Sequence, residues 1–377
     1  MNSHSHHIGR LVSAASVAGF LFWGAHSLGQ TKEFASHYKV LGPVIKGNLA
    51  VYPVIGSTSF DTATLLTLDE GIRSGQVVVT ELSQSTGLVR PRPVTPGIWD
   101  ERPLPFPHRD SARVNELAIV NNSAHPLVLL AGEIVTGGKR DRVVGKDRII
   151  PAHSEPVSLD VFCVEPHRWT ETSVGFGAMG FSMAQPSVRL KAMAVSDQQQ
   201  VWDEVAKSRA AFFAAAPAAG MRAMQSTSSY AATIQNDSVK QQIDTLAVPI
   251  ERSYGELSSR LHSEKAVGAV VAVRGELIWA DVFASSALLE KYWPKLIRSY
   301  AAESLSGGVR PTIYGVAPTA EQAQRFLDHL NARHESVETE PGLYRNTEIT
   351  GEDFEAFILT ALLPNTGFDV HIAKMKR

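Results

Sequence analysis

Short apolar runs, separated by residues that favour turns, fill the first half of the chain. Segments 49–55 and 76–80 read LAVYPVI and QVVVT, and Gly, Ser and Asp residues lie between them. Runs of this length with such boundaries predict β-strands, and residues 67–74 predict a helical turn between them. Strands are expected again over residues 114–164. The first half is therefore predicted to form a mainly antiparallel β-sandwich or a barrel-like unit.

Apolar residues in the second half recur at helical spacing instead. Residues 198–213 and 287–305 are predicted helices in which apolar side chains recur at helical spacing, and residues 319–333 are a further predicted helix. Residues 239–262 also predict a helix, which Pro249 should kink or split in two because proline lacks the N–H that the helix needs.

A β-hairpin is expected among these helices. Segments 266–273 and 276–282 flank Arg274-Gly275, a two-residue turn that places Gly where a positive φ is easy. Two tail segments, 342–347 and 368–373, predict further strands. The whole chain is therefore predicted to be an α+β protein.

Composition shifts divide the chain into three predicted parts. Residues 1–29 are expected to be a signal peptide, residues 30–190 a β-rich domain, and residues 191–377 a helix-rich α+β domain with the hairpin.

The first 29 residues carry the pattern of an export signal. A polar start precedes a largely apolar stretch over 11–25, and Ser27-Leu28-Gly29 supplies small residues before a cut ahead of Gln30. An uncleaved anchor is the alternative, but the apolar core is shorter than the roughly 20 residues that span a bilayer. The mature protein is therefore expected to be periplasmic or secreted, with no stable membrane span.

Six prolines lie within residues 90–107, so a regular element is not expected there. The segment is predicted to be a loop insertion, and the alternative is a stretch that binds a protein partner.

Composition limits the function classes. The chain has 377 residues, of which 44% are hydrophobic, and this is enough for a large core. Its net charge of −2 gives no overall attraction to nucleic acid. The single cysteine, Cys163, excludes an intramolecular disulfide and is expected to be an inert buried thiol.

One block, residues 131–169, gathers charged residues at the ends of apolar strands. Strand side chains alternate between two faces, so Glu133 continues the row of Leu129 and Ala131, and Glu165 continues the row that ends at Cys163. A carboxylate at the edge of a core either has a partner or has a raised pKa.

Basic residues surround these two carboxylates in the sequence. A Gly137-Gly138 turn comes directly before the basic pair Lys139-Arg140. The backbone N–H groups of this turn, together with guanidinium groups, would suit an anion. The alternative is that Glu–Arg bridges only fix the strand ends. The candidate substrate-binding residues are Lys139, Arg140, Arg142, Arg168 and Trp169.

The block also resembles a known family. The pattern G-E-x-V-x-G, then R-x-V, I-P-A-x-S and C-V-E-x-x-R-W is similar to the bacterial ARG-and-rhodanese-phosphatase-associated protein domain family, in which ARG denotes an ADP-ribosylglycohydrolase. The resemblance implies a link to NAD or ADP-ribose metabolism and no established reaction. It is carried by Gly132, Glu133, Gly137, Arg142, Pro151, Ser154, Cys163, Glu165, Arg168 and Trp169.

The signatures of nucleotide-binding loops, zinc proteases and serine hydrolases are missing from the sequence. A metal site made by His153, Glu165 and His167 can be imagined, but the spacing is not that of a closed zinc site, so no metal is predicted and the cofactor is unknown.

Two function classes remain open. In the first, Glu133 and Glu165 are the catalytic acid and base of a hydrolase that acts on an anionic, ADP-ribose-like or phosphorylated compound. In the second, the chain is a non-catalytic envelope module that binds a ligand or whose Glu–Arg pairs only lock the fold.

Overall fold

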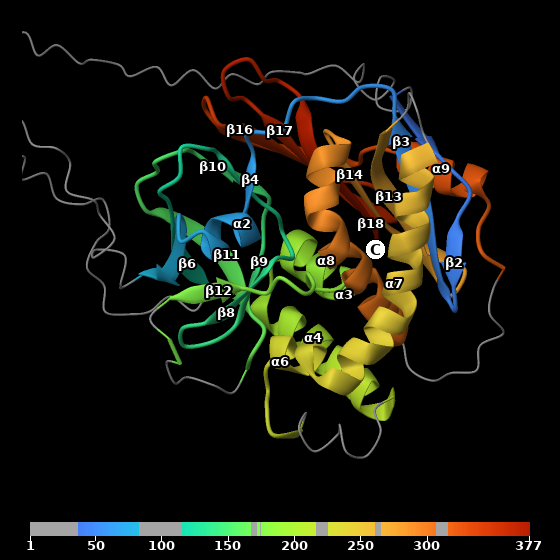
Figure 1. The fold of residues 1–377 in the computed structure, drawn as a ribbon, viewed down its shortest axis with the longest axis horizontal. Coiled ribbons are helices and arrows are strands. Elements are labelled where there is room, and N and C mark those ends of the chain that lie inside the picture. The colour runs from blue at the N-terminus through green and yellow to red at the C-terminus, as the bar shows by residue number, and fades with distance from the viewer. Residues whose placement is uncertain are drawn as a thin grey trace, which may run out of the picture.

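The computed structural model describes residues 37–82, 115–166, 172–173, 175–215, 225–260, 265–306 and 316–377. The expected signal peptide over 1–29 and the proline-rich segment 90–107 lie outside the described residues. Helices and antiparallel sheets are mixed as predicted, and the fold class is α+β (Figure 1).

The largest sheet has nine strands in the order β1-β3-β13-β14-β18-β17-β16-β15, with β2 paired to β3. The first three strands of the described chain therefore belong to the sheet that the second half mainly builds. The predicted division of the chain into two domains at residue 190 stays a prediction. The strands are β1 (Tyr38–Val40), β2 (Val44–Lys46), β3 (Leu49–Gly56), β13 (Lys265–Val273), β14 (Glu276–Phe283), β15 (His334–Glu340), β16 (Tyr344–Thr350), β17 (Phe354–Ala361) and β18 (Asp369–Lys376).

A six-stranded sheet, in the order β12-β8-β9-β11-β6-β5, makes the barrel-like unit of the first half. A bridge between Thr80 and Gly175 joins its two edges, which nearly closes the sheet. A three-stranded sheet, β10-β7-β4, lies beside it. The strands are β4 (Leu66–Thr67), β5 (Val77–Glu81), β6 (Glu116–Asn121), β7 (Leu127–Leu129), β8 (Ile134–Gly137), β9 (Arg142–Val144), β10 (Arg148–Ile150), β11 (Val157–Cys163) and β12 (Phe176–Ala178).

Helices pack on both faces of the nine-stranded sheet because its strands alternate between two apolar faces. Val51, Val271 and Trp279 share a core with α7 and α8, whereas Tyr52 and Val270 face α9. The helical elements are α2 (Leu68–Arg73), α3 (Pro186–Leu190), the π-helix η2 (Lys191–Val195), α4 (Gln198–Ala215), α6 (Tyr230–Gln235), α7 (Asp237–Arg260), α8 (Ser286–Ser306) and α9 (Ala320–Asp328).

The strongest local patterns are confirmed. The predicted hairpin is β13–β14, and both turn residues, Arg274 and Gly275, have positive φ angles of 56° and 83°, as a turn of type I′ requires. The helix predicted over 287–305 is α8. The helical turn is α2, which begins with a capping box between Thr67 and Glu70.

Pro249 does not split its helix in two, so that one of the two expectations for this proline is wrong, whereas the kink stays a prediction. Helix α7 is continuous from Asp237 to Arg260 with the proline inside it. Ile243 and Ala247 before the proline, and Ile250 and Tyr254 after it, are all buried in the same core. Packing on both sides of the proline compensates for the hydrogen bond that it removes.

The tail contains two strands that are not among the predicted ones. Strand β15 reads HESVETE and is exposed along its whole length, so it has no alternation of apolar and polar residues. Strand β17 reads FEAFILTA and is mostly buried. Together with β16 and β18 they extend the large sheet well beyond the predicted hairpin.

Within the described ranges, none of the helices combines the length and the apolar character needed to cross a membrane.

Candidate functional site

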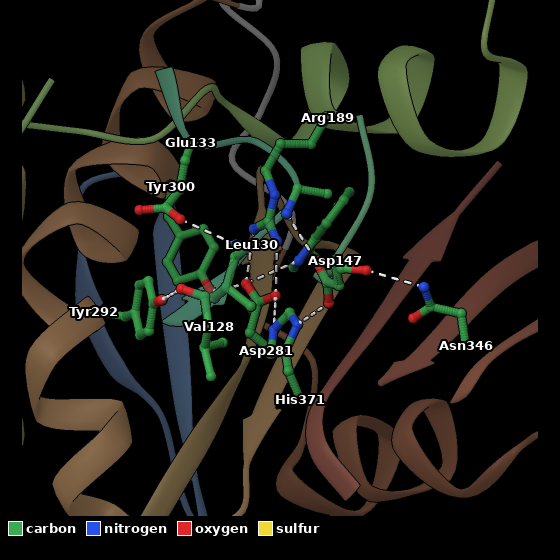
Figure 2. A network of polar contacts seen from close by, with 12 residues as sticks. Val128, Leu130, Glu133, Asp147, Arg189, Asp281, Tyr292, Tyr300, Asn346 and His371 are labelled. Atoms are coloured by element: carbon green, nitrogen blue, oxygen red, sulfur yellow. Dashed lines mark hydrogen bonds and ion pairs between the residues drawn. The ribbon is translucent and has the colours of Figure 1, made fainter. Parts of the chain in front are cut away.

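Four charged side chains meet in the interior, where the large sheet faces α3 and the β9–β10 loop (Figure 2). Asp281 lies on β14 and His371 on the adjacent strand β18. His371 Nε2 is 3.0 Å from Asp281 Oδ1, and its Nδ1 is 2.6 Å from Asp147 Oδ2. Arg189, from α3, donates to both carboxylate oxygens of Asp281 at 2.9 and 3.0 Å. All four residues are at most 3% exposed. We call this group the interior network.

The Asp281 carboxylate is surrounded by donors. The indole Nε1 of Trp279 donates to Oδ2 at 2.9 Å, and the hydroxyl of Tyr300 donates to the same oxygen. The Arg189 guanidinium also stacks on the Trp279 ring, 4.4 Å from its centre. Donors and a paired cation are what a buried carboxylate needs to stay ionised.

Asp147 carries the interior network toward the C-terminal strands. Its Oδ1 accepts a hydrogen bond from the backbone N–H of Ala131 at 2.7 Å. Its backbone carbonyl accepts from the side-chain amide of Asn346 on β16 at 2.9 Å (Figure 2). Through this one residue, the β9–β10 loop is attached to both β18 and β16.

The environment fixes the charges of the interior network. Burial alone would lower the pKa of His371, but Asp147 and then Asp281 raise the pKa from 6.5 to about 9. Burial alone would raise the pKa of Asp281, but Arg189 and His371 hold that pKa well below its usual range. Two carboxylates and two cations therefore balance each other in the core at neutral pH.

The raised pKa of His371 predicts that stability falls in mild base. A histidine whose folded pKa lies above its unfolded pKa contributes stability that is full below about pH 6.5 and is lost as pH rises through about 9. Urea unfolding of the wild type between pH 6 and 10 should show a decline on the order of 3 kcal/mol. A His371→Gln variant should lack this decline, and parallel curves for the two proteins would contradict the assignment.

Gly132 gives Arg189 its path into the core. The glycine has a φ of 93°, and a Cβ atom there would lie 2.6 Å from Cγ of Arg189. A side chain at position 132 would therefore collide with the arginine in addition to straining the backbone. Close packing against Arg189 thus explains why a glycine precedes Glu133 in the charged block.

Glu133 belongs to a second buried cluster. Nζ of Lys295, on α8, lies 2.6 Å from Glu133 Oε1 and 2.7 Å from Asp69 Oδ2. Glu133 Oε2 accepts from the backbone N–H of Leu130 at 3.0 Å. Burial raises the pKa of Glu133, while Glu133 and Asp69 outweigh burial and raise the pKa of Lys295. The partner of Glu133 is therefore a lysine from α8 rather than an arginine of the charged block.

Glu165 lies in a third group, at the β8–β9 turn. Its Oε2 accepts from the backbone N–H of Asp141 at 3.2 Å, and Asp141 in turn accepts from the hydroxyl of Ser229 at 2.6 Å. Arg142 is 1% exposed and donates to the backbone carbonyl of Arg140 at 2.7 Å. The backbone N–H of Lys139 donates to Glu81 at 3.0 Å.

Cys163 is buried next to this third group. Burial raises the pKa of its thiol, and the positive charges of Arg142 and Arg140 only partly oppose that rise. A buried thiol that keeps its proton is a small hydrophobic residue rather than a nucleophile.

The two predicted catalytic carboxylates differ in the contacts described for them, and their catalytic roles stay a prediction. The contacts described for Glu133 involve Lys295 and Leu130, and those described for Glu165 involve Asp141. Lys139, Arg140 and Arg142 lie at the β8–β9 turn, next to Asp141, whose backbone N–H binds Glu165. Arg168 and Trp169 lie outside the described residues.

A cavity of about 440 Å³ lies between the C-terminal strands and the barrel-like unit. One wall is formed by β15, β16 and β17, a second by the β9–β10 loop and β11, and a third by Ala192, Met193 and Ser196 at η2. Pockets of 300–1,000 Å³ are typical of small-molecule sites. Its ionisable lining residues are Glu116, Lys146, Asp147, Asp160, Glu338 and Glu348, so carboxylates predominate.

The cavity and the interior network share structural parts. Asp147 belongs to both, and Asn346, which binds the Asp147 carbonyl, also lines the cavity. Helix α3 carries Arg189 and continues directly into η2, whose residues form the third wall. Short π-helical turns occur disproportionately at functional sites. The cavity is therefore bounded by segments that also hold the interior network.

Within the part of the chain that the structure describes, no three His, Cys, Asp or Glu side chains converge in a way that could hold a metal ion.

The interior network was not predicted from the sequence, although two of its members carry a visible signal. Asp281 interrupts the apolar strand Trp279–Phe283, and His371 does the same in the strand that follows Asp369. A charged residue on the buried face of a strand needs a partner in the core. The partners themselves, Asp147 and Arg189, come from distant segments that the local pattern does not connect.

A protein-family model described as "ARG and Rhodanese-Phosphatase-superfamily-associated Protein domain" matches residues 37–374, which confirms the resemblance found in the charged block. Neither the curated proteins nor the solved structures contain a match to the chain.

Proposed function

The chain belongs to the ARG and Rhodanese-Phosphatase-superfamily-associated Protein domain family, and from this premise we propose that it is a non-catalytic protein that binds a small molecule in the cavity between its C-terminal strands and its barrel-like unit. The family is described by its association with other proteins and not by a reaction of its own. A binding role fits that description.

The observation that carries the proposal is the place of Asp147. This residue lines the cavity and at the same time binds His371, a buried member of the interior network. A lining residue that is anchored by a buried ion pair cannot relax easily, so the cavity wall is pre-organised. Pre-organised polar groups favour selective binding over loose adsorption.

The positions of Glu133 and Glu165 support binding over hydrolysis. Glu133 is 1% exposed and Glu165 is 5% exposed, and neither residue lines the cavity. A general acid and a general base must both reach the bond that they cleave. We therefore favour the binding module over the hydrolase in which these two residues are catalytic.

We do not propose that the ligand is an anion. Lys139, Arg140 and Arg142 do not line the cavity, whose lining carboxylates outnumber its one lysine. A periplasmic or secreted location remains a proposal that rests on the pattern of residues 1–29, and a protein partner at residues 90–107 rests likewise on sequence alone.

Blocking the cavity tests the proposal. Ser336 lines the cavity from the exposed strand β15, so Ser336→Trp should fill the cavity without disturbing the core. Glu335→Trp places the same side chain at the neighbouring position, which does not line the cavity, and is the matched control. Thermal-shift screening of the mature protein against ADP-ribose, ribose 5-phosphate, amino sugars and neutral sugars provides the measurement.

At least one compound should raise the melting temperature of the wild type and of Glu335→Trp, and should fail to do so with Ser336→Trp. Isothermal calorimetry on that compound should agree. The proposal is wrong if no compound stabilises the wild type, or if Ser336→Trp is stabilised as much as Glu335→Trp.

A further inference from the structure

Glu348 is the feature of the cavity that the proposed function leaves unexplained. It lies at the middle of β16, in register with Ser336 on β15 and Phe357 on β17. Residues paired across antiparallel strands share one face of the sheet, and all three of these residues line the cavity. The Glu348 side chain is therefore on the face of the C-terminal strands that forms the cavity wall.

Other lining carboxylates already have cations. Asp147 lies 2.6 Å from the His371 imidazole. Asp160 lies 2.6 Å from the Arg148 guanidinium, and Glu338 pairs with Lys146. These three negative charges are therefore neutralised by the protein itself.

Glu348 differs from them. Within the described ranges its carboxylate forms neither an ion pair nor a hydrogen bond, although its side chain is partly buried. Burial and the nearby carboxylate of Glu355 raise its pKa, while Lys146, His334 and Arg377 lower the pKa only from a distance. A half-buried carboxylate of this kind is stabilised by any cation that reaches it.

The groups beside Glu348 in the cavity are uncharged hydrogen-bonding groups. They are supplied by Ser336 and by Asn346, whose amide is oriented by the Asp147 carbonyl. Such groups pair with hydroxyls. The cavity thus combines the carboxylate of Glu348, which has no ion pair in the described part of the chain, with partners for neutral polar atoms.

We infer that the ligand of this cavity carries a protonated amine, which pairs with Glu348, and hydroxyl groups, which pair with the neutral polar residues beside it: an amino sugar or a similar amino polyol. The inference rests on the proposed function, since it names the ligand class of the same cavity. It also reverses the sign of charge that the basic residues of the sequence suggest.

Three probes of nearly equal size separate the charge preference: glucosamine, glucose and glucose 6-phosphate. Calorimetric titration of the mature protein should give at least tenfold tighter binding of glucosamine than of glucose, and no binding of glucose 6-phosphate. A Glu348→Gln variant, which keeps the shape and removes the charge, should bring glucosamine within about twofold of glucose. Glu335→Gln removes a carboxylate from a position on β15 that does not line the cavity and should leave the preference intact.

The possible failures are distinguishable. If glucose or glucose 6-phosphate binds as tightly as glucosamine, and Ser336→Trp blocks that binding, the cavity is a binding site but the amine assignment is wrong. If glucosamine binding is unaffected by Glu348→Gln, the assignment to Glu348 is wrong. If glucosamine does not bind at all, the inference is overturned, and unfolding curves of each variant exclude loss of folding as the cause.

Discussion

Replacement of Asp281 by asparagine is expected to lower the free energy of unfolding by about 3–5 kcal/mol. The carboxylate receives two bonds from Arg189, one from Trp279 and one from Tyr300, and it also contacts His371. Asparagine has nearly the same shape but no charge, so Arg189 would remain in the core without its counter-ion. The loss therefore measures an uncompensated buried charge rather than a cavity.

Asp160→Asn is the matched control for this prediction. Asp160 also pairs with an arginine, Arg148, at 2.6 Å, but its side chain is 58% exposed. Exposed ion pairs contribute about 0–1 kcal/mol, so this variant should unfold almost as the wild type does in urea. Equal losses for the two variants would mean that burial does not determine the strength of the Asp281 contacts.

The second large effect is expected at Lys295. Replacement by methionine nearly keeps the length of the side chain and removes the cation that lies within ion-pair distance of Glu133 in the described part of the chain. We expect a loss of about 3 kcal/mol, because Glu133 must then take up a proton or remain as an isolated buried charge. Urea unfolding at pH 7 measures the loss.

Two further variants give this prediction its controls. Lys291 lies on the same helix as Lys295 and pairs with Glu70 of α2, and both of these side chains are partly exposed. Lys291→Met should therefore cost no more than about 1 kcal/mol. Addition of Glu133→Gln to Lys295→Met should recover part of the loss, because it removes the stranded charge. A double variant that is less stable than Lys295→Met would show that Glu133 is held mainly by Leu130 and not by the lysine.

Local chemistry made part of the fold predictable. The Arg274-Gly275 turn has two positive φ angles that follow from its length and its glycine. The apolar face of α8 follows from the helical spacing of residues such as Leu288 and Tyr292, which are buried. Strand β15 was missed because every one of its side chains is exposed, so nothing in its sequence alternates.

The candidate site was predicted only in part, for a different reason. The block that contains Gly132, Glu133 and Asp147 was identified as important, and its glycine and its first carboxylate do lie against charged residues of the core. Their partners, Arg189 and Lys295, are contributed by helices whose positions depend on the whole fold. Strand parity places a charge on a face, but it does not state which distant residue that charge meets.

The pairing of β3 with β13 has a consequence for how the chain folds. Leu49 hydrogen-bonds across to the strand that ends at Val273, so most of the polypeptide must be present before this ladder can form. Until then the apolar strand Leu49–Gly56 has no partner other than the short strands β1 and β2. Closing so long a loop carries an entropic cost and slows the search for the native pairing. Strand β3 is synthesised long before β13, so its apolar residues wait for their partner strand during folding. This makes β3 a segment that a chaperone could protect.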